Sequence, residues 1–165
     1  MNALSIKHIQ DNSPYTVTIG KDNEIEFTTE YGVEYRVFFM EDYSIWEENA
    51  YQFLINKKNK KASPNDIKLR DTILTIVEAF FITNPYILLY ICETGDSMQA
   101  ARNRIFTRWF RESDSQQKYY FQDVTIHADG IDNFAALILQ KTNPELDSIV
   151  SQFNDFIELM QDKPQ

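Results

Sequence analysis

The first half of the chain alternates apolar and polar residues with a period of two, which is the pattern of half-buried β-strands. Four such segments are separated by short turns, and residues 41–49 between the third and the fourth predict a loop or a short extra strand. The four predicted strands are Tyr15–Ile19, Ile25–Thr29, Val33–Phe39 and Tyr51–Ile55. Short connections between alternating strands are typical of an antiparallel meander with one buried face.

After residue 62 the apolar positions follow the period of amphipathic helices. Ser63 as the N-cap and Pro64 in the first helical position predict a helix that ends at Asn84-Pro85. The uniformly apolar segment 86–92 predicts a central strand that is covered on both faces. The remaining predicted elements are a helix at 97–111, strands at 119–127 and 134–139, and a last helix over 146–160.

This order, β-β-β-β-α-β-α-β-β-α, predicts the α+β fold class. We expect a single domain over residues 1–165, with a mixed, mainly antiparallel sheet of six or seven strands and three helices packed on it. Residues 1–13 carry no clear pattern and are expected to form a loose N-terminal segment. Twelve Phe, nine Tyr and two Trp are ample for a hydrophobic core in a chain of 165 residues.

The predicted helix at 97–111 carries four arginines and no acid. At about 100° per residue, one side of this helix is apolar and the opposite side carries Arg104, Arg108 and Arg111. The apolar side consists of Met98, Ala101, Ile105, Phe106, Trp109 and Phe110. Arg102 falls inside the apolar arc, and a buried lone charge is costly. Arg102 therefore needs a carboxylate, carbonyl oxygens, water or an anionic ligand.

The corner before this helix is the candidate ligand site. Free backbone N–H groups at a helix start bind anions, and Arg102 would add the positive charge. The alternative is that Arg102 pairs with an acid such as Glu93, and that Asp96 simply caps the helix. The candidate anion corner comprises Glu93, Thr94, Gly95, Asp96, Ser97 and Arg102.

Charge is distributed unevenly along this acidic chain. The net charge of −9 repels nucleic acid and anionic membranes at long range, yet residues 57–70 carry six basic residues against one acid. The candidate basic face consists of Lys57, Lys58, Lys60, Lys61, Arg104, Arg108 and Arg111. These residues form either two separate solvated patches or one shared surface for phosphates or an acidic partner.

Few catalytic motifs are compatible with the sequence. Four glycines leave little room for a glycine-rich phosphate loop, and no Walker loop, HExxH, CxxC or GxSxG motif occurs. The single cysteine, Cys92, excludes an internal disulfide. His127, Asp129 and Asp132 share a turn, but turn chemistry explains the aspartates. We therefore expect no metal, no cofactor, no catalytic residue and no membrane span, and a cytoplasmic location.

Two resemblances add to this picture. The segments Tyr90–Glu93, Gln99–Phe106 and Arg108–Phe110, with the earlier Phe27–Tyr35 pattern, resemble an uncharacterised bacterial family of domains of unknown function. That resemblance implies a small single domain and no particular activity.

The order of strands, helix, strand, helix and two strands is similar to the core of the GNAT acyltransferase superfamily. This likeness implies a coenzyme A pyrophosphate site in the loop before the first of these helices. The corresponding loop here, Lys57–Asp66, has no glycine, and the family's Asn-x-x-Ala-x-x-x-Tyr segment is not matched near Asp96–Arg104. No catalytic residue is carried over.

The function we expect is that of a small binding protein that recognises a protein partner or a small anionic ligand, and not an enzyme. One alternative is an acyltransferase-like enzyme. The other is nucleic-acid binding through the basic face. Oligomeric state and partner identity are not encoded in any motif of the chain.

Overall fold

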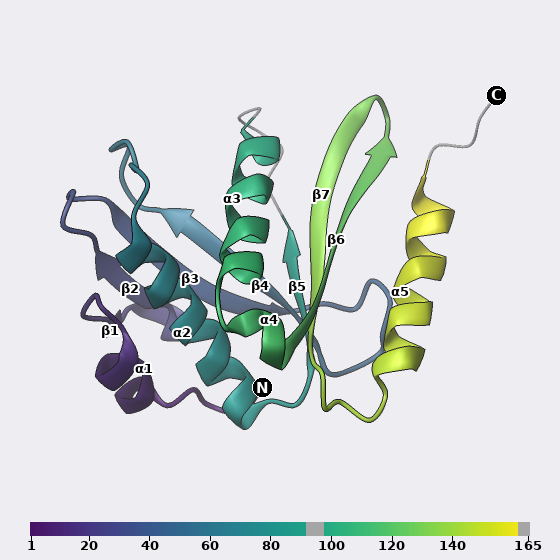
Figure 1. Ribbon diagram of the computed structural model, residues 1–165, viewed down its shortest axis with the longest axis horizontal. Coiled ribbons are helices and arrows are strands. Elements are labelled where there is room, and N and C mark those ends of the chain that lie inside the picture. Colours follow the sequence, from purple (N-terminus) through teal and green to yellow (C-terminus); the bar gives the residue numbers. More distant parts are fainter. Residues whose placement is uncertain (92–97, 162–165) are drawn as a thin grey trace. The chain divides into compact units, whose positions relative to one another are not determined.

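The computed structural model describes residues 1–91 and 98–161 (Figure 1). These residues form seven strands in the order β1-β2-β3-β4-β5-β7-β6 and five α-helices, so the fold is α+β with a mainly antiparallel sheet, as predicted. The chain divides into two compact units, Met1–Met40 with Phe53–Pro85, and Glu41–Gln52 with Tyr86–Gln165. Strand β4 contributes residues to both units, and the single domain remains a prediction.

The first unit contains the predicted meander. Strands β1 (Thr18–Ile19), β2 (Ile25–Thr28) and β3 (Glu34–Glu41) pair antiparallel, with Phe27 opposite Tyr35. A short 3-10 turn, Lys21–Asn23, lies between β1 and β2, and β4 runs over Ala50–Lys57. Alternate side chains of β2 and of the first half of β3 are buried, because these apolar positions face the core, whereas both residues of β1 are exposed.

Helix α1 (Ile6–Asn12) corrects the expectation of a loose N-terminal segment. Ser5 caps it by accepting a hydrogen bond from the N–H of His8, and Ile9 is completely buried. A seven-residue helix has too short an apolar stripe to be recognised from its sequence, and packing against α2 stabilises it.

Helix α2 (Ile67–Thr83) begins three residues later than predicted. Its N-cap is Asp66, whose carboxylate accepts from the N–H of Lys68 at 2.9 Å, and not Ser63. The Ser63 hydroxyl instead accepts from the Tyr35 hydroxyl at 2.6 Å. The predicted cap was wrong because Ser63 and Asp66 are both good capping residues, and tertiary contacts select between them.

The second unit contains the other predicted strands and helices. Strand β5 (Ile87–Ile91) pairs antiparallel with β7 (Ile131–Gln140), which pairs antiparallel with β6 (Tyr119–Ala128). The helices are α3 (Gln99–Glu112), the short α4 (Ser115–Lys118), which was not predicted, and α5 (Leu146–Met160). Residues 42–49 connect β3 to β4 without an extra strand.

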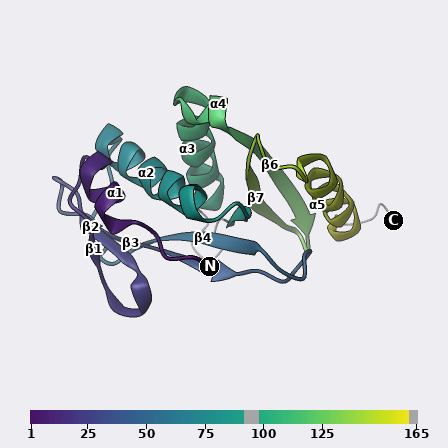
Figure 2. The same ribbon diagram turned by 90° about the horizontal axis from the view of Figure 1, so that it is seen from below.

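Strand β7 lies at the centre of a three-layer arrangement. Figures 1 and 2 show β7 and β6 running between α3 and α5. On the α5 side, Leu137 and Leu139 pack in one cluster with Ile149 and Phe153. On the α3 side, aromatic rings fill the layer. Residues Ala136 to Leu139 are completely buried, so β7 is covered on both faces.

The turn between β6 and β7 is tighter than predicted. Asp129 and Gly130 both have positive φ, at 54° and 73°, and Ala128 pairs with Ile131. This is a two-residue hairpin of the type that Asp-Gly favours. The strands therefore extend to the turn, and His127 and Asp132 are paired strand residues. Within residues 1–91 and 98–161, no helix is long and apolar enough to cross a membrane.

A buried hydrogen bond joins the segment between α1 and β1 to the start of α2. The Tyr15 hydroxyl donates to the Asp66 carboxylate at 2.6 Å, and both residues are 8% exposed. Burial, followed by this hydrogen bond, raises the pKa of Tyr15 to about 12. The Asp66 carboxylate thus accepts two hydrogen bonds, one from the Lys68 N–H at the helix terminus and one from the Tyr15 hydroxyl.

We expect Tyr15→Phe to lower the free energy of unfolding by about 1.5–3 kcal/mol, because a buried carboxylate loses a donor. The folded pKa lies above the ordinary value near 10, so the Tyr15 contribution is complete below pH ~10 and is lost as pH rises towards ~12. Urea unfolding at neutral and alkaline pH measures both effects. The exposed Tyr31→Phe is the control; equal effects of the two substitutions would contradict the prediction.

Candidate functional site

Of the predicted anion corner, the structure describes Arg102 alone. Glu93, Thr94, Gly95, Asp96 and Ser97 lie outside the described residues, and Cys92 does as well. Arg102 lies in the first turns of α3, where it is half-buried and has an interaction partner. The corner therefore remains a prediction.

Aromatic packing rotates α3 relative to the predicted orientation. Phe106 stacks on Tyr90 with ring centroids 3.8 Å apart, and Phe110 stacks on Phe121 at 4.8 Å. Met98 and Ile105, predicted to be buried, are 54% and 45% exposed. The expectation that these two residues lie on the buried side was wrong, because the large rings have more apolar area to bury than the aliphatic side chains.

This rotation places polar residues over the sheet. Thr107 is only 7% exposed, and Arg102 lies at the margin of the buried face and not at its centre. Arg104, Arg108 and Arg111 are exposed, as the wheel predicted.

A groove of about 300 Å³ runs along the exposed side of α3 next to β6. Three guanidinium groups surround it, and Arg111 pairs with the Asp123 carboxylate at 3.2 Å. The residues that line it are Asn103, Arg104, Thr107, Arg108, Arg111, Glu112 and Asp123. Within the described part of the chain, Arg104 and Arg108 form no ion pair. The groove therefore combines two uncompensated positive charges with two carboxylates at its margin.

Two polar atoms in the groove lack hydrogen-bond partners among the described residues. They are the Thr107 hydroxyl oxygen and the Asn103 side-chain oxygen, both inaccessible to solvent. Asn103 and Thr107 are one helical turn apart, so they lie on the same side of α3. An unpaired buried polar group costs about 1–3 kcal/mol. The Thr107 hydroxyl is therefore a buried donor without a partner among the described residues, on a side chain that lines the groove.

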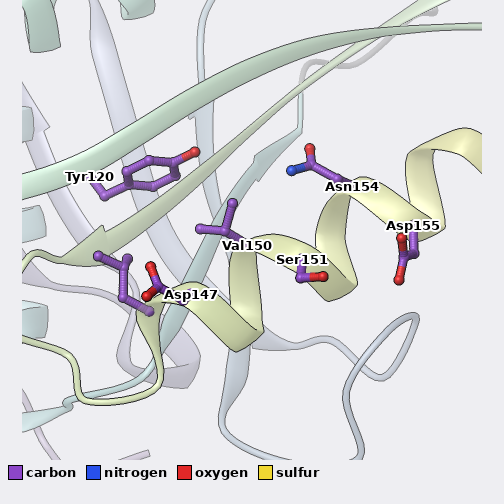
Figure 3. Close-up of a pocket in the computed structure, with 7 residues that line it drawn as sticks. Tyr120, Asp147, Val150, Ser151, Asn154 and Asp155 are labelled. Atoms are coloured by element: carbon purple, nitrogen blue, oxygen red, sulfur yellow. The ribbon is translucent and has the colours of Figure 1, made fainter.

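A second groove, of about 390 Å³, lies between α5 and β6 (Figure 3). Tyr120 faces the side of α5 that carries Val150 and Asn154, as Figure 3 shows. Its lining residues are Tyr120, Leu146, Asp147, Val150, Ser151, Asn154 and Asp155. Gln122 bridges its two walls, accepting from the Tyr120 hydroxyl and donating to Asn154, both at 2.7 Å.

Sequence reasoning did not find this second groove. The apolar stripe of α5 was recognised, but Asp147, Ser151 and Asp155 beside it were not distinguished from an ordinary solvated face. The only sequence signal is that small and acidic residues border the stripe at helical spacing. Burial raises the pKa of the Tyr120 phenol, whose hydroxyl donates to the Gln122 side chain.

The lysine segment of the candidate basic face belongs to the first unit. Lys58 pairs with Glu26 at 3.2 Å, and the Lys57 ammonium donates to the carbonyl of Lys61 at 2.9 Å. Further along the chain, the Lys68 ammonium lies 3.5 Å from the Glu30 carboxylate. Acids of the same unit thus offset part of this charge. Because the arginines belong to the second unit, a face shared by both segments remains a prediction.

The hairpin residues do not gather into a metal-binding group. His127 Nδ1 pairs with the Asp132 carboxylate across the β6–β7 ladder, and Asp129 lies in the turn. Among residues 1–91 and 98–161, no three His, Cys, Asp or Glu side chains lie close enough to hold a metal ion.

Comparison with known proteins identifies the family of this chain. Residues 65–155, more than half of the chain, match a family of unknown function (DUF6169). The chain belongs to this family. The matched region contains α3, β6 and both grooves, whereas Lys57, Lys58, Lys60 and Lys61 lie before it. No curated protein and no solved structure matches the chain.

We expect Thr107→Val to leave the free energy of unfolding unchanged or to raise it by up to about 1 kcal/mol, because an unpaired hydroxyl is replaced by a methyl group. Thr75→Val is the matched control. The Thr75 hydroxyl is also buried in a helix but donates to the carbonyl of Asp71 at 2.7 Å, so this change costs about 1 kcal/mol. Thermal and urea unfolding compare the two; a loss of stability in Thr107→Val equal to that of Thr75→Val would contradict the prediction.

Proposed function

We propose that this protein is a non-enzymatic binding module that recognises an anionic group, carried by a small ligand or by a protein partner, in the α3 groove. The observation that carries the proposal is the combination of the buried Thr107 hydroxyl with the guanidinium groups of Arg104 and Arg108, all of them without partners among residues 1–91 and 98–161. A ligand oxygen reaches the hydroxyl once the Thr107 side chain turns towards the groove that it lines. Guanidinium groups bind carboxylates and phosphates through charge-assisted, often bidentate hydrogen bonds.

The same residues argue for binding over catalysis. Arginine stays protonated at all physiological pH values, so it fixes an anion without transferring protons. Asp123 pairs with Arg111, so its carboxylate does not neutralise Arg104 or Arg108. In a chain of net charge −9, such a local groove attracts an anion only at short range, which favours a specific ligand over an extended polyanion.

The acyltransferase-like alternative is favoured by the order of elements after β4, in which a helix, a strand, helices and two strands follow one another. The segment 58–66, where the resemblance requires a pyrophosphate cradle, contains no glycine. The nucleic-acid alternative needs an uncompensated basic surface, and the pairing of Lys58 with Glu26 weakens it.

The proposal is tested with inorganic pyrophosphate at low ionic strength, measured by titration calorimetry. The double substitution Arg104→Gln and Arg108→Gln removes two charge-assisted contacts, so we expect the affinity to fall at least ~10-fold. Asp123→Asn removes a competing carboxylate, and we expect it to raise the affinity by about fivefold.

Lys141→Gln is the control, because it removes an exposed positive charge outside the groove. Equal losses of affinity in this variant and in the double arginine variant would contradict the proposal, since both would then reflect net charge alone.

A second prediction separates binding from acyl transfer. Acetyl-coenzyme A carries a pyrophosphate, so we expect it to raise the melting temperature no more than pyrophosphate does at the same concentration. We also expect that effect to vanish in the double arginine variant. A shift several degrees larger than with pyrophosphate, retained without Arg104 and Arg108, would instead support the acyltransferase-like alternative.

A further inference from the structure

Strand β6 is the last strand of the sheet, and among the described residues it pairs with β7 alone. In an antiparallel ladder the N–H and C=O groups of one residue point to the same side, and successive residues alternate. The Gln161 side chain accepts from the N–H of His127 and donates to the carbonyl of Thr125, both at 3.0 Å. Odd-numbered residues of β6 therefore direct their backbone groups away from β7, and the outward set includes Phe121 and Asp123.

The outer edge of β6 is closed over only half of its length. At Thr125 and His127 the amide of Gln161, the residue that ends α5, forms the two hydrogen bonds that a neighbouring strand would form. Within the described part of the chain, no such group covers the outward N–H and C=O of Phe121 and Asp123. Long uncovered edges are unusual, because they invite pairing with another chain.

The two grooves flank this open half on opposite faces of the sheet. Asp123 lines the α3 groove, and Tyr120 lines the α5 groove. Side chains of an added strand alternate between the same two faces. One set would meet Arg104 and Arg108, and the other would meet Asp147 and Asp155.

We propose that an extended polypeptide segment of another protein adds to β6 at Phe121 and Asp123, with acidic side chains in the α3 groove and basic side chains over the α5 groove. The inference rests on the proposed function, because it names the carrier of the anionic group. Backbone hydrogen bonds supply part of the affinity, and the alternating charges supply the specificity. The stems of lysine or arginine side chains pack on Tyr120 and Val150 while their charged ends reach the aspartates.

Charge complementarity favours this occupant over a second copy of the chain. Antiparallel pairing of two β6 edges in one continuous sheet requires a two-fold axis perpendicular to that sheet. That axis sets α3 beside α3 and α5 beside α5. The arginines of one copy would then face those of the other, and the aspartates likewise, so like charges oppose the dimer. A segment with acids on one face and bases on the other meets no such repulsion.

The test uses two synthetic octapeptides of equal composition and zero net side-chain charge. One alternates glutamate and lysine, and the other carries four glutamates followed by four lysines. We expect the alternating peptide to bind at least ~10-fold more tightly, and to slow the hydrogen exchange of the Phe121 and Asp123 amides. Equal affinities, or unchanged exchange at these two amides, would overturn the proposal.

Paired variants isolate the edge hydrogen bond. Proline at an outward-facing strand position leaves the ladder to the other neighbour intact. Asp123→Ala and Asp123→Pro remove the same carboxylate, but only the proline removes the outward N–H. We expect Asp123→Ala to keep or strengthen peptide binding and Asp123→Pro to weaken it at least ~10-fold. Equal peptide affinities of the two variants would overturn strand addition.

A measurement on the unmodified protein covers the case in which the proline variant fails to fold. N-methylation of every second peptide residue removes the backbone N–H groups that point to one side of the strand. Either the odd-numbered or the even-numbered residues can be methylated, and we expect only one of these two patterns to abolish binding. Equal effects of both patterns would overturn the proposal.

Pyrophosphate titrations separate the two levels of the inference. If pyrophosphate binding depends on Arg104 and Arg108 but the alternating peptide fails, the anion groove stands and strand addition is overturned. If pyrophosphate binding is independent of the two arginines, the proposed function itself fails. A dimer of the free protein that Asp123→Pro dissociates would identify a second copy as the occupant and overturn the proposal.

Discussion

The second unit depends on one constraint, which is that β7 is buried on both faces and paired along both edges. Residues Ala136 to Leu139 are completely buried, so one helix must cover each face of this strand. Helix α3 supplies an aromatic layer on one face, and α5 supplies aliphatic and aromatic contacts on the other. With β5 on one edge of β7, strand β6 must occupy the other edge and close the sheet there. Both grooves result from this placement, because each lies where a covering helix meets β6.

The α3 groove shows how packing can create chemistry at a helix surface. Phe106 and Phe110 take the buried positions because their rings remove the largest apolar area from water. The helix then has one orientation, and that orientation buries the Thr107 hydroxyl without a hydrogen-bond partner in the described part of the chain. Folded proteins seldom leave such groups unpaired, and in the proposed function the oxygen of an anion completes this hydrogen bond. The surrounding arginines give that oxygen a preferred charge.

The anion corner and the groove share one helix but differ in what supports them. The corner was predicted from Arg102 and from residues 93–97. Arg102 is described by the structure, but residues 93–97 lie outside the described part of the chain. The groove was only half predicted, since the wheel placed Arg104, Arg108 and Arg111 on the outside but not Asp123 beside them. Asp123 lies on β6, and its approach to Arg111 depends on a strand pairing that a helical wheel does not contain.

The sequence by itself determined the α+β class, the order of the strands and main helices, and the outward face of the arginines, because these depend on local periodicity. It also determined the membership in a family of unknown function. Tertiary structure decided the helix α1, the cap of α2 at Asp66, the rotation of α3 and the capping of the β6 edge by Gln161. The physical reason is the same for each. Several local choices have nearly equal free energies, and contacts between residues far apart in the chain select one of them.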